Sequence, residues 1–154
     1  MSIIELKERP TIADDIKLSD RYNQFRELLS ELKKKELSQQ CITVINESIE
    51  EINSSSFAGL ALKKLIKERQ SAILKLIEKE HKITPKNYYR NLWGLFGMSG
   101  FGLPIGVAFG LSIDNMGMLG IGLPIGLAIG FAIGLSMDKK ALNEGRQLDL
   151  EIKY

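Results

Sequence analysis

Chemically reactive side chains are scarce in this sequence. Its 154 residues include one cysteine, Cys41, and one histidine, His81. A single cysteine cannot form an intramolecular disulfide, which excludes small secreted folds held together by disulfides. His81 lies between Glu80 and Lys82 and is expected to be a solvated surface residue, and no Gly-x-x-x-x-Gly-Lys phosphate loop is present. We therefore expect no enzymatic activity, no cofactor and no metal site.

Charge is almost absent from one long stretch of the chain. Between Asn91 and Met137 the only charged residue is Asp114. The two segments 92–113 and 116–137 contain 22 residues each and no charge. As helices they would each span about 33 Å, which is enough to cross a hydrocarbon core of about 30 Å. The sequence therefore predicts two transmembrane helices.

The flanks of these segments predict a hairpin with a defined orientation. The polar, turn-forming pair Asp114 and Asn115 joins the two segments. The turn has no positive charge, whereas basic residues flank both outer ends, so the positive-inside rule places both termini in the cytoplasm. The basic residues expected at lipid headgroups are Lys82, Lys86, Arg90, Lys139 and Lys140, and the expected interfacial aromatic residues are Tyr88, Tyr89 and Trp93. The alternative, a buried hairpin in a soluble protein, would need a larger polar shell than the remaining residues supply.

Glycine is concentrated where charge is missing, with twelve of the fourteen glycines in or between the two segments. Residues 100–110 and 120–130 form an internal repeat with a period of 20 residues. An interior glycine costs a helix about 1 kcal/mol relative to alanine, so rows of glycine indicate closely approaching helix backbones. The residues expected to pack helices recur every four positions: Gly102, Gly106, Gly110, Gly122, Gly126, Gly130 and Gly134. Those left for contacts with neighbouring chains are Gly94, Gly97, Gly117 and Gly120.

The first 84 residues predict amphipathic helices. Apolar residues three and four apart begin after Ser19, a plausible N-cap. Near 33–38 the apolar stripe rotates, which indicates either a break or a helix with a shifted face, and a loop is expected at 53–56. A further helix is expected over 57–81, and Thr84-Pro85 predicts the start of the next one. The core available to these helices is small, so we expect self-association.

The predicted organisation is an all-α fold in three parts. Residues 1–84 form a cytoplasmic helical region, either a small bundle or a coiled-coil hairpin. Residues 85–140 form the transmembrane hairpin, and residues 141–154 form a polar C-terminal tail.

The end of the chain also carries a family resemblance. The stretch Gly120–Tyr154, with Met137-Asp-Lys-Lys-Ala141 and Glu144-Gly-Arg-Gln147, resembles the ending of some bacterial glycine-zipper membrane proteins. The resemblance covers about the last 60 residues. It implies a two-helix Gly-x-x-x-Gly hairpin in the bacterial inner membrane. It implies no activity, because most of these proteins have no assigned biochemical role.

Two functions fit these observations. The first is a structural or accessory membrane protein that forms homo-oligomers through glycine faces and binds a protein partner through the helices over 19–81. The alternative is a pore-forming protein, toxin-like or a defence effector. Only Ser99, Ser112 and Ser136 could line a pore, and they lie near the segment ends, which favours the first function. A proton-carrying ring subunit is disfavoured because no carboxylate lies at mid-membrane. The basic stretch 63–90 is expected to meet anionic lipid rather than nucleic acid.

Overall fold

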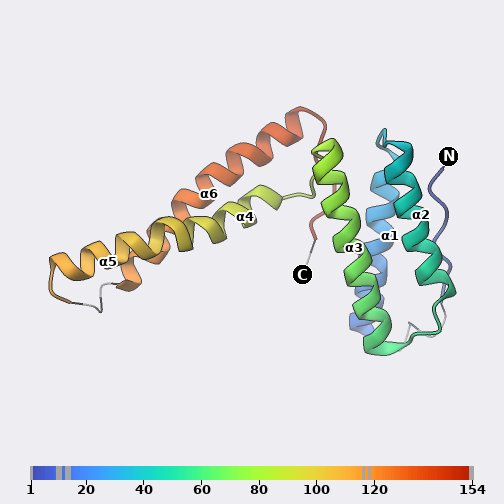
Figure 1. Cartoon of the computed structure of the whole chain (residues 1–154), viewed down its shortest axis with the longest axis horizontal. Coiled ribbons are helices and arrows are strands. Elements are labelled where there is room, and N and C mark those ends of the chain that lie inside the picture. Colours follow the sequence, from blue (N-terminus) through green and yellow to red (C-terminus); the bar gives the residue numbers. More distant parts are fainter. Residues whose placement is uncertain (1, 10–11, 13–14, 116, 118, 153–154) are drawn as a thin grey trace. The chain divides into compact units, whose positions relative to one another are not determined.

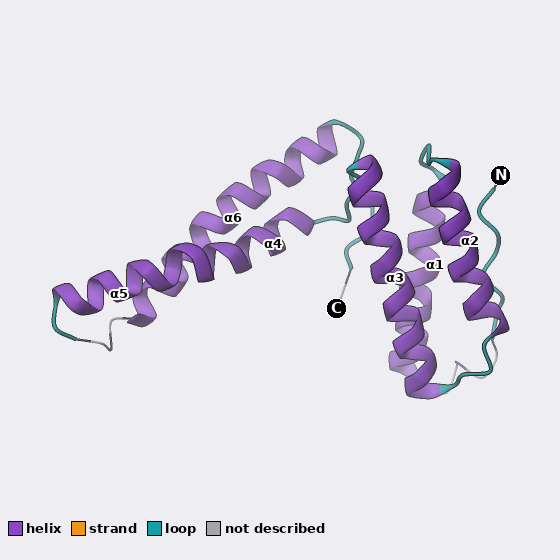
Figure 2. Cartoon of the chain, viewed as in Figure 1, coloured by secondary structure: helices purple, strands orange, loops and turns teal. Residues whose placement is uncertain are grey.

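The computed structural model describes residues 2–9, 12, 15–115, 117 and 119–152. These residues form helices and no strands, which confirms the predicted all-α class (Figures 1 and 2). The chain divides into two compact units, one of Met1–Thr84 with Leu148–Tyr154 and the other of Pro85–Gln147. The second unit is therefore an insertion in the chain of the first.

The first unit is a three-helix bundle of α1 (Ile16–Lys33), α2 (Gln39–Ser54) and α3 (Gly59–His81). Each helix turns an apolar stripe, with residues three and four apart, toward one shared core. The break between α1 and α2 falls within the predicted range. The largest fully buried apolar side chains are Phe25, Leu28, Leu32, Ile45, Ile49, Ile52, Leu62, Ile66, Ile73, Ile77 and Leu148.

Two helix starts differ from those expected. Asp15, not Ser19, caps α1, because its carboxylate accepts the N–H of Leu18 at 3.1 Å. Thr84 does not begin a helix, and α4 starts later, at Tyr88. Ser19 is the fourth residue of α1, and α4 begins three residues after Pro85, the residue expected at its first position.

The N-terminal arm, residues 2–9, runs extended and is held by two asparagine side chains of α2. Each asparagine accepts the N–H of one arm residue and donates to the carbonyl of the residue two positions earlier. Seven helical residues advance about 10.5 Å and three extended residues about 10 Å, so two amides two turns apart match the arm. The bonds, 2.9–3.1 Å long, join Asn46 to Ile4 N and Ser2 O, and Asn53 to Lys7 N and Glu5 O.

Arg9, at the end of this arm, binds the C-terminal end of α2. Its guanidinium donates to the carbonyl of Ile52 in the last turn of α2, and to the carbonyls of Ser55 at 2.7 Å and Phe57 at 3.2 Å, which follow the helix. A cation is favourable there because the last carbonyls of a helix have no partner within the helix and carry partial negative charge. The arm is therefore part of the fold of the bundle.

Replacing Asn46 by alanine is expected to release the arm. The side chain is 7% exposed and makes two hydrogen bonds to the arm, so the change should lower the free energy of unfolding by about 1–3 kcal/mol. Asn53→Ala, whose bonds are solvent-exposed, should cost less. Amide exchange over residues 2–9 and thermal unfolding followed by circular dichroism test this. Equal protection of the arm in the wild type and Asn46→Ala would contradict it.

The segment 148–152 completes the core of the bundle. Its alternating apolar side chains, Leu148, Leu150 and Ile152, are 0%, 8% and 5% exposed. Leu148 donates its N–H to the carbonyl of Thr84 at 2.9 Å, which ties the segment to the residues that follow α3. The expectation of a separate polar tail over 141–154 was therefore wrong: α6 runs to Asn143, and the apolar residues beyond it are buried.

Glu31 also contacts this segment, and we expect the contact to be sensitive to acid. Its carboxylate pairs with Lys34 and accepts the N–H of Asp149 at 3.1 Å, and these bonds, Lys34 first, hold the pKa of Glu31 below its usual value of 4.5. A lowered pKa in the folded state means that the stabilisation is present above pH 4.5 and is lost as the pH falls through the folded value. Glu31→Gln should therefore reduce the loss of stability below pH 4.5, as measured by thermal unfolding against pH. Glu27→Gln, an exposed carboxylate on α1, is the control, and identical pH profiles for both variants would refute the contact.

The second unit is a hairpin of two long helical segments lying side by side (Figure 1). The first segment, Tyr88–Ser112, consists of α4 (Tyr88–Gly97), the π-helical turn η2 (Met98–Gly102) and α5 (Leu103–Ser112). The second is α6 (Leu119–Asn143). Both overlap the predicted spans but begin and end a few residues away from them, and Met116, the expected start of the second span, lies outside the described residues.

The π-helical turn η2 lies directly before Pro104. Proline has no N–H to donate, and its ring presses on the carbonyl four residues earlier, that of Gly100. Widening the helix over one turn moves that carbonyl away and accommodates the ring without ending the segment. In α6, Pro124 lies inside a helix that continues without such a turn.

Candidate membrane-spanning hairpin

Glycine backbones form the contact between the two segments of the hairpin. A Cβ added to Gly126 would lie 2.5 Å from the Cα of Gly102, and one added to Gly122 would lie 2.6 Å from the Cα of Gly106. A Cβ on Gly102 would lie 2.9 Å from the carbonyl oxygen of Gly122. Side chains cannot approach backbone this closely, so only glycine fits at these positions. Gly102 and Gly122 are also equivalent residues of the internal repeat, so the two copies of the repeat contact each other where the segments cross.

The contact continues toward the open end of the hairpin. A Cβ on Gly130 would lie 2.7 Å from the carbonyl carbon of Trp93, and one on Gly134 would lie 2.5 Å from the Cα of Arg90. Gly110, the remaining glycine of the expected set, is buried on α5. The seven expected packing glycines are thus buried within one chain rather than spread over several contacts.

The glycines expected to serve neighbouring chains divide into two groups. Gly94 and Gly97 lie inside the hairpin, since a Cβ on Gly97 would be 2.8 Å from the Cα of Gly130, which corrects their assignment. Gly117 lies beside the side chain of Asn115. At Gly120, and also at Gly100, an added Cβ would meet nothing within 4 Å among the described residues apart from its chain neighbours and the nearby backbone of its own helix.

The outward faces of the hairpin are apolar and exposed. Both segments are long and apolar enough to cross a membrane, yet only 28% of the apolar window of Tyr88–Ser112 and 22% of that of Leu119–Asn143 is buried. Core helices of a soluble protein are mostly buried, so these faces lack the cover that a water-soluble fold would give them. Large exposed side chains include Leu95, Phe96, Phe101, Leu103, Val107, Phe109, Leu111, Ile113, Ile121, Ile125, Ile129, Phe131 and Leu135.

A buried carboxylate, that of Asp138, ties the two segments together near the open end of the hairpin. Asp138 lies on α6, is 6% exposed, and accepts the N–H of Tyr89 at 3.0 Å and that of Arg90 at 2.9 Å. The first N–H groups of a helix have no partner within it and carry partial positive charge. Asp138 therefore caps α4 from a neighbouring helix, across 49 residues of sequence. Sequence reasoning missed this role, although the matching motifs Leu-Ser-x-Asp that end at Asp114 and Asp138 were a signal.

The expected headgroup residues lie in both units. Lys82 follows α3 in the first unit, with φ of +56°, and pairs with Glu78 at 4.0 Å. Lys86, Arg90, Lys139 and Lys140 belong to the hairpin unit, where the lysines are exposed and Arg90 is half-buried.

The expected aromatic residues lie at the start of the first segment and are half-buried. The rings of Tyr88 and Tyr89 meet edge to face with centroids 5.1 Å apart, and Trp93 lies near Phe96 at 6.5 Å. At the other end of the segment, Asp114 has φ of +50°, as a tight turn requires, and Asp114 and Asn115 are exposed.

Comparisons with known proteins found no relative of this chain. No family model, curated protein or solved structure matches the chain.

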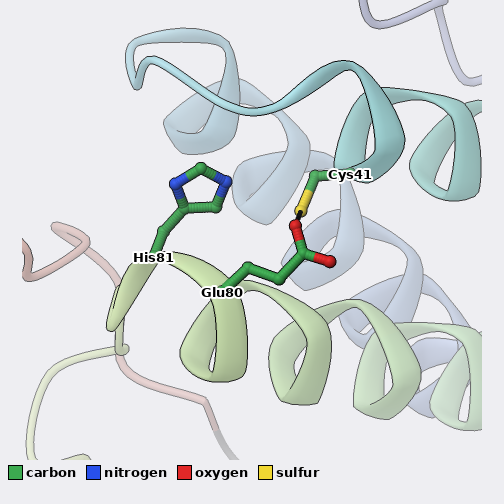
Figure 3. Close-up of side chains that lie close together, drawn as sticks. All are labelled: Cys41, Glu80 and His81. Carbon is green, nitrogen blue, oxygen red and sulfur yellow. Dashed lines mark hydrogen bonds between the residues drawn. The ribbon is translucent and has the colours of Figure 1, made fainter.

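A second cluster of reactive groups lies in the bundle, where α2 begins and α3 ends (Figure 3). The thiol of Cys41 donates to Glu80 Oε2 at 3.1 Å, and the hydroxyl of Ser38 donates to the same oxygen at 2.9 Å. These bonds, Cys41 first, lower the pKa of Glu80, whereas burial raises the pKa of the Cys41 thiol. The N–H of Ser38 donates to His81 Nε2 at 3.1 Å. His81 is half-buried, and its Nε2 accepts this hydrogen bond.

Proposed function

We propose that this chain is a non-enzymatic, integral membrane protein of structural or accessory type, whose hairpin crosses the bilayer. The observation that carries the proposal is the exposed apolar surface around a hairpin closed on itself by glycine contacts. Soluble monomers rarely expose contiguous apolar patches larger than a few hundred Å². A bilayer covers such a surface, and the helical backbone satisfies its own polar groups within it.

The ends of the hairpin support a same-side topology. The chain leaves the bundle at Thr84 and returns at Leu148, and these two residues share a backbone hydrogen bond of 2.9 Å. Residues bonded in this way cannot lie on opposite sides of a membrane. Lysines lie near the open end of the hairpin and none lies in the turn, so the positive-inside rule favours a cytoplasmic bundle.

Self-association is the second part of the proposal. Most glycines pack within the hairpin, which leaves Gly100 and Gly120 as small residues on outward surfaces. Small residues let helices of neighbouring chains approach closely in lipid. The bundle, whose helices span most of 19–81, is then available to a protein partner or a second copy.

A pore is less well supported by the side chains. The hydroxyl of Ser99 donates to the carbonyl of Leu95 at 3.0 Å, and that of Ser112 donates to Ala108 at 2.7 Å. Both hydroxyls donate to carbonyls of their own helix, so their O–H groups are not free to donate along a polar path. Dye release and conductance from liposomes that contain the purified protein test this alternative. Sealed liposomes with a defined oligomer support the accessory role, and steady conductance would replace it with the pore.

Single-cysteine labelling tests the topology. In a Cys41→Ser background, cysteines at Lys86, Asn115 and Asn143 are reacted with a membrane-impermeant maleimide in oriented vesicles. We expect 86 and 143 to react from one side and 115 from the other. Reaction of 86 and 143 from opposite sides would refute the hairpin, and reaction of all three from one side would refute a full crossing.

A further inference from the structure

We propose that Cys41, Glu80 and His81 form a binding site for one divalent cation of the zinc class. One potential ligand atom from each residue lies within 4.8 Å of the others, and Cys41 Sγ and Glu80 Oε2 are 3.1 Å apart. The ligands of a tetrahedral zinc, bound at about 2.0–2.3 Å, lie about 3.3–3.8 Å from one another. Side-chain rotations that move these atoms by about 1 Å would therefore bring all three around one ion.

The donor set indicates which metals would bind. A thiolate and an imidazole favour Zn²⁺ and neighbouring transition metals over Mg²⁺ and Ca²⁺, which take oxygen ligands. Thiolate and carboxylate together carry two negative charges, which neutralise the ion. Glu80 is exposed, so the ion can enter from solvent and a water can take the fourth position.

Neighbouring groups prepare the site. The hydroxyl of Ser38 donates to Glu80 Oε2 and orients the carboxylate, as outer partners of metal ligands do. Glu80 and His81 are the last two residues of α3, and the partial negative charge at the C-terminal end of a helix favours a cation.

Metal binding replaces the proton of the Cys41 thiol with the metal ion. The S–H bond of Cys41 breaks, its proton leaves to solvent, and a sulfur–metal bond forms. The lone pair of His81 Nε2 passes from the N–H of Ser38 to the metal, and that N–H is left to water, since Ser38 is half-exposed. The ion then joins the start of α2 to the end of α3.

The test is a cobalt titration of the full-length, untagged protein in detergent under a thiol-free reductant. We expect one Co²⁺ per chain, with a near-ultraviolet sulfur-to-cobalt charge-transfer band and the visible bands of a tetrahedral site, displaced by Zn²⁺. Cys41→Ser should abolish the charge-transfer band. Glu80→Gln and His81→Gln should weaken binding by about tenfold or more, the range seen even for outer partners of metal ligands.

The matched control is Glu78→Gln, which removes a carboxylate from the same end of α3 that pairs with Lys82. It should leave the titration unchanged, and circular dichroism should show the same helix content in every variant. The proposal is overturned if the wild type gives no charge-transfer band. It is also overturned if the band survives Cys41→Ser, or if Glu78→Gln weakens binding as much as Glu80→Gln. Because Glu80 is exposed, its variant remains informative even if Cys41→Ser fails to fold.

Discussion

Replacing Gly126 by leucine is expected to force the two segments of the hairpin apart. A Cβ at this position would already lie 2.5 Å from the Cα of Gly102, and further atoms would extend into the backbone of the first segment. Backbone cannot move aside as a side-chain end can, so the whole contact must open. The smaller change, Gly126→Ala, should lower the free energy of unfolding by about 1–3 kcal/mol through overpacking.

Gly120 provides the matched control, because it lies on the same helix and an added Cβ there would contact no other described part of the chain within 4 Å. Gly120→Ala should be neutral or should stabilise the isolated chain by up to about 1 kcal/mol through helix propensity. Unfolding by titration with a denaturing detergent measures the free energies. Distances between spin labels on the outward faces of the two segments measure the separation. Equal effects of alanine at 126 and 120 would show that glycine contacts do not close the hairpin.

Removing the carboxylate of Asp138 is expected to cost nearly as much. Asp138→Ala leaves the N–H groups of Tyr89 and Arg90 without their acceptor, and we expect a loss of about 2–3 kcal/mol from the cap and the unpaired donors. Asp138→Asn keeps one acceptor oxygen without the charge, so its effect should lie between the wild type and the alanine variant.

Amide exchange at Tyr89 and Arg90 gives the most direct readout. Both amides should exchange faster in Asp138→Ala, while amides in the middle of α6 change little. Lys139→Ala, an exposed neighbour on the same helix, is the control. Unchanged protection of the two amides in Asp138→Ala would exclude Asp138 as the cap of α4.

The helices could be predicted because the sequence patterns that indicate them are local. Apolar residues three and four apart identify α1, α2 and α3, and the uncharged runs identify the two hairpin segments, since each pattern spans only a few turns. The glycine rows predicted close packing, but not which row meets which. Gly97 belongs to the intrachain contact because the π-helical turn and the antiparallel register place it against Gly130, and neither can be read from spacing alone.

Apart from the local Asp15 cap of α1, the contacts that sequence reasoning missed join distant residues. Asp138 caps a helix 49 residues away, and Asn46 binds the arm 42 residues before it. The same holds for Cys41 and Glu80, which are 39 residues apart. Polar residues of these types are ordinary in helices, and only the folded chain shows that their partners are close. Sequence reasoning therefore found the scaffold but not the cluster at the start of α2.

The buried segment 148–152 has a consequence for the order in which the protein is made. Synthesis runs from the N-terminus, so α1, α2 and α3 leave the ribosome before the hairpin, and Leu148, Leu150 and Ile152 leave after it. The bundle cannot complete its core until both apolar segments have emerged. Final folding of the bundle thus follows production of the hairpin, and an early truncation would leave an exposed gap in the core.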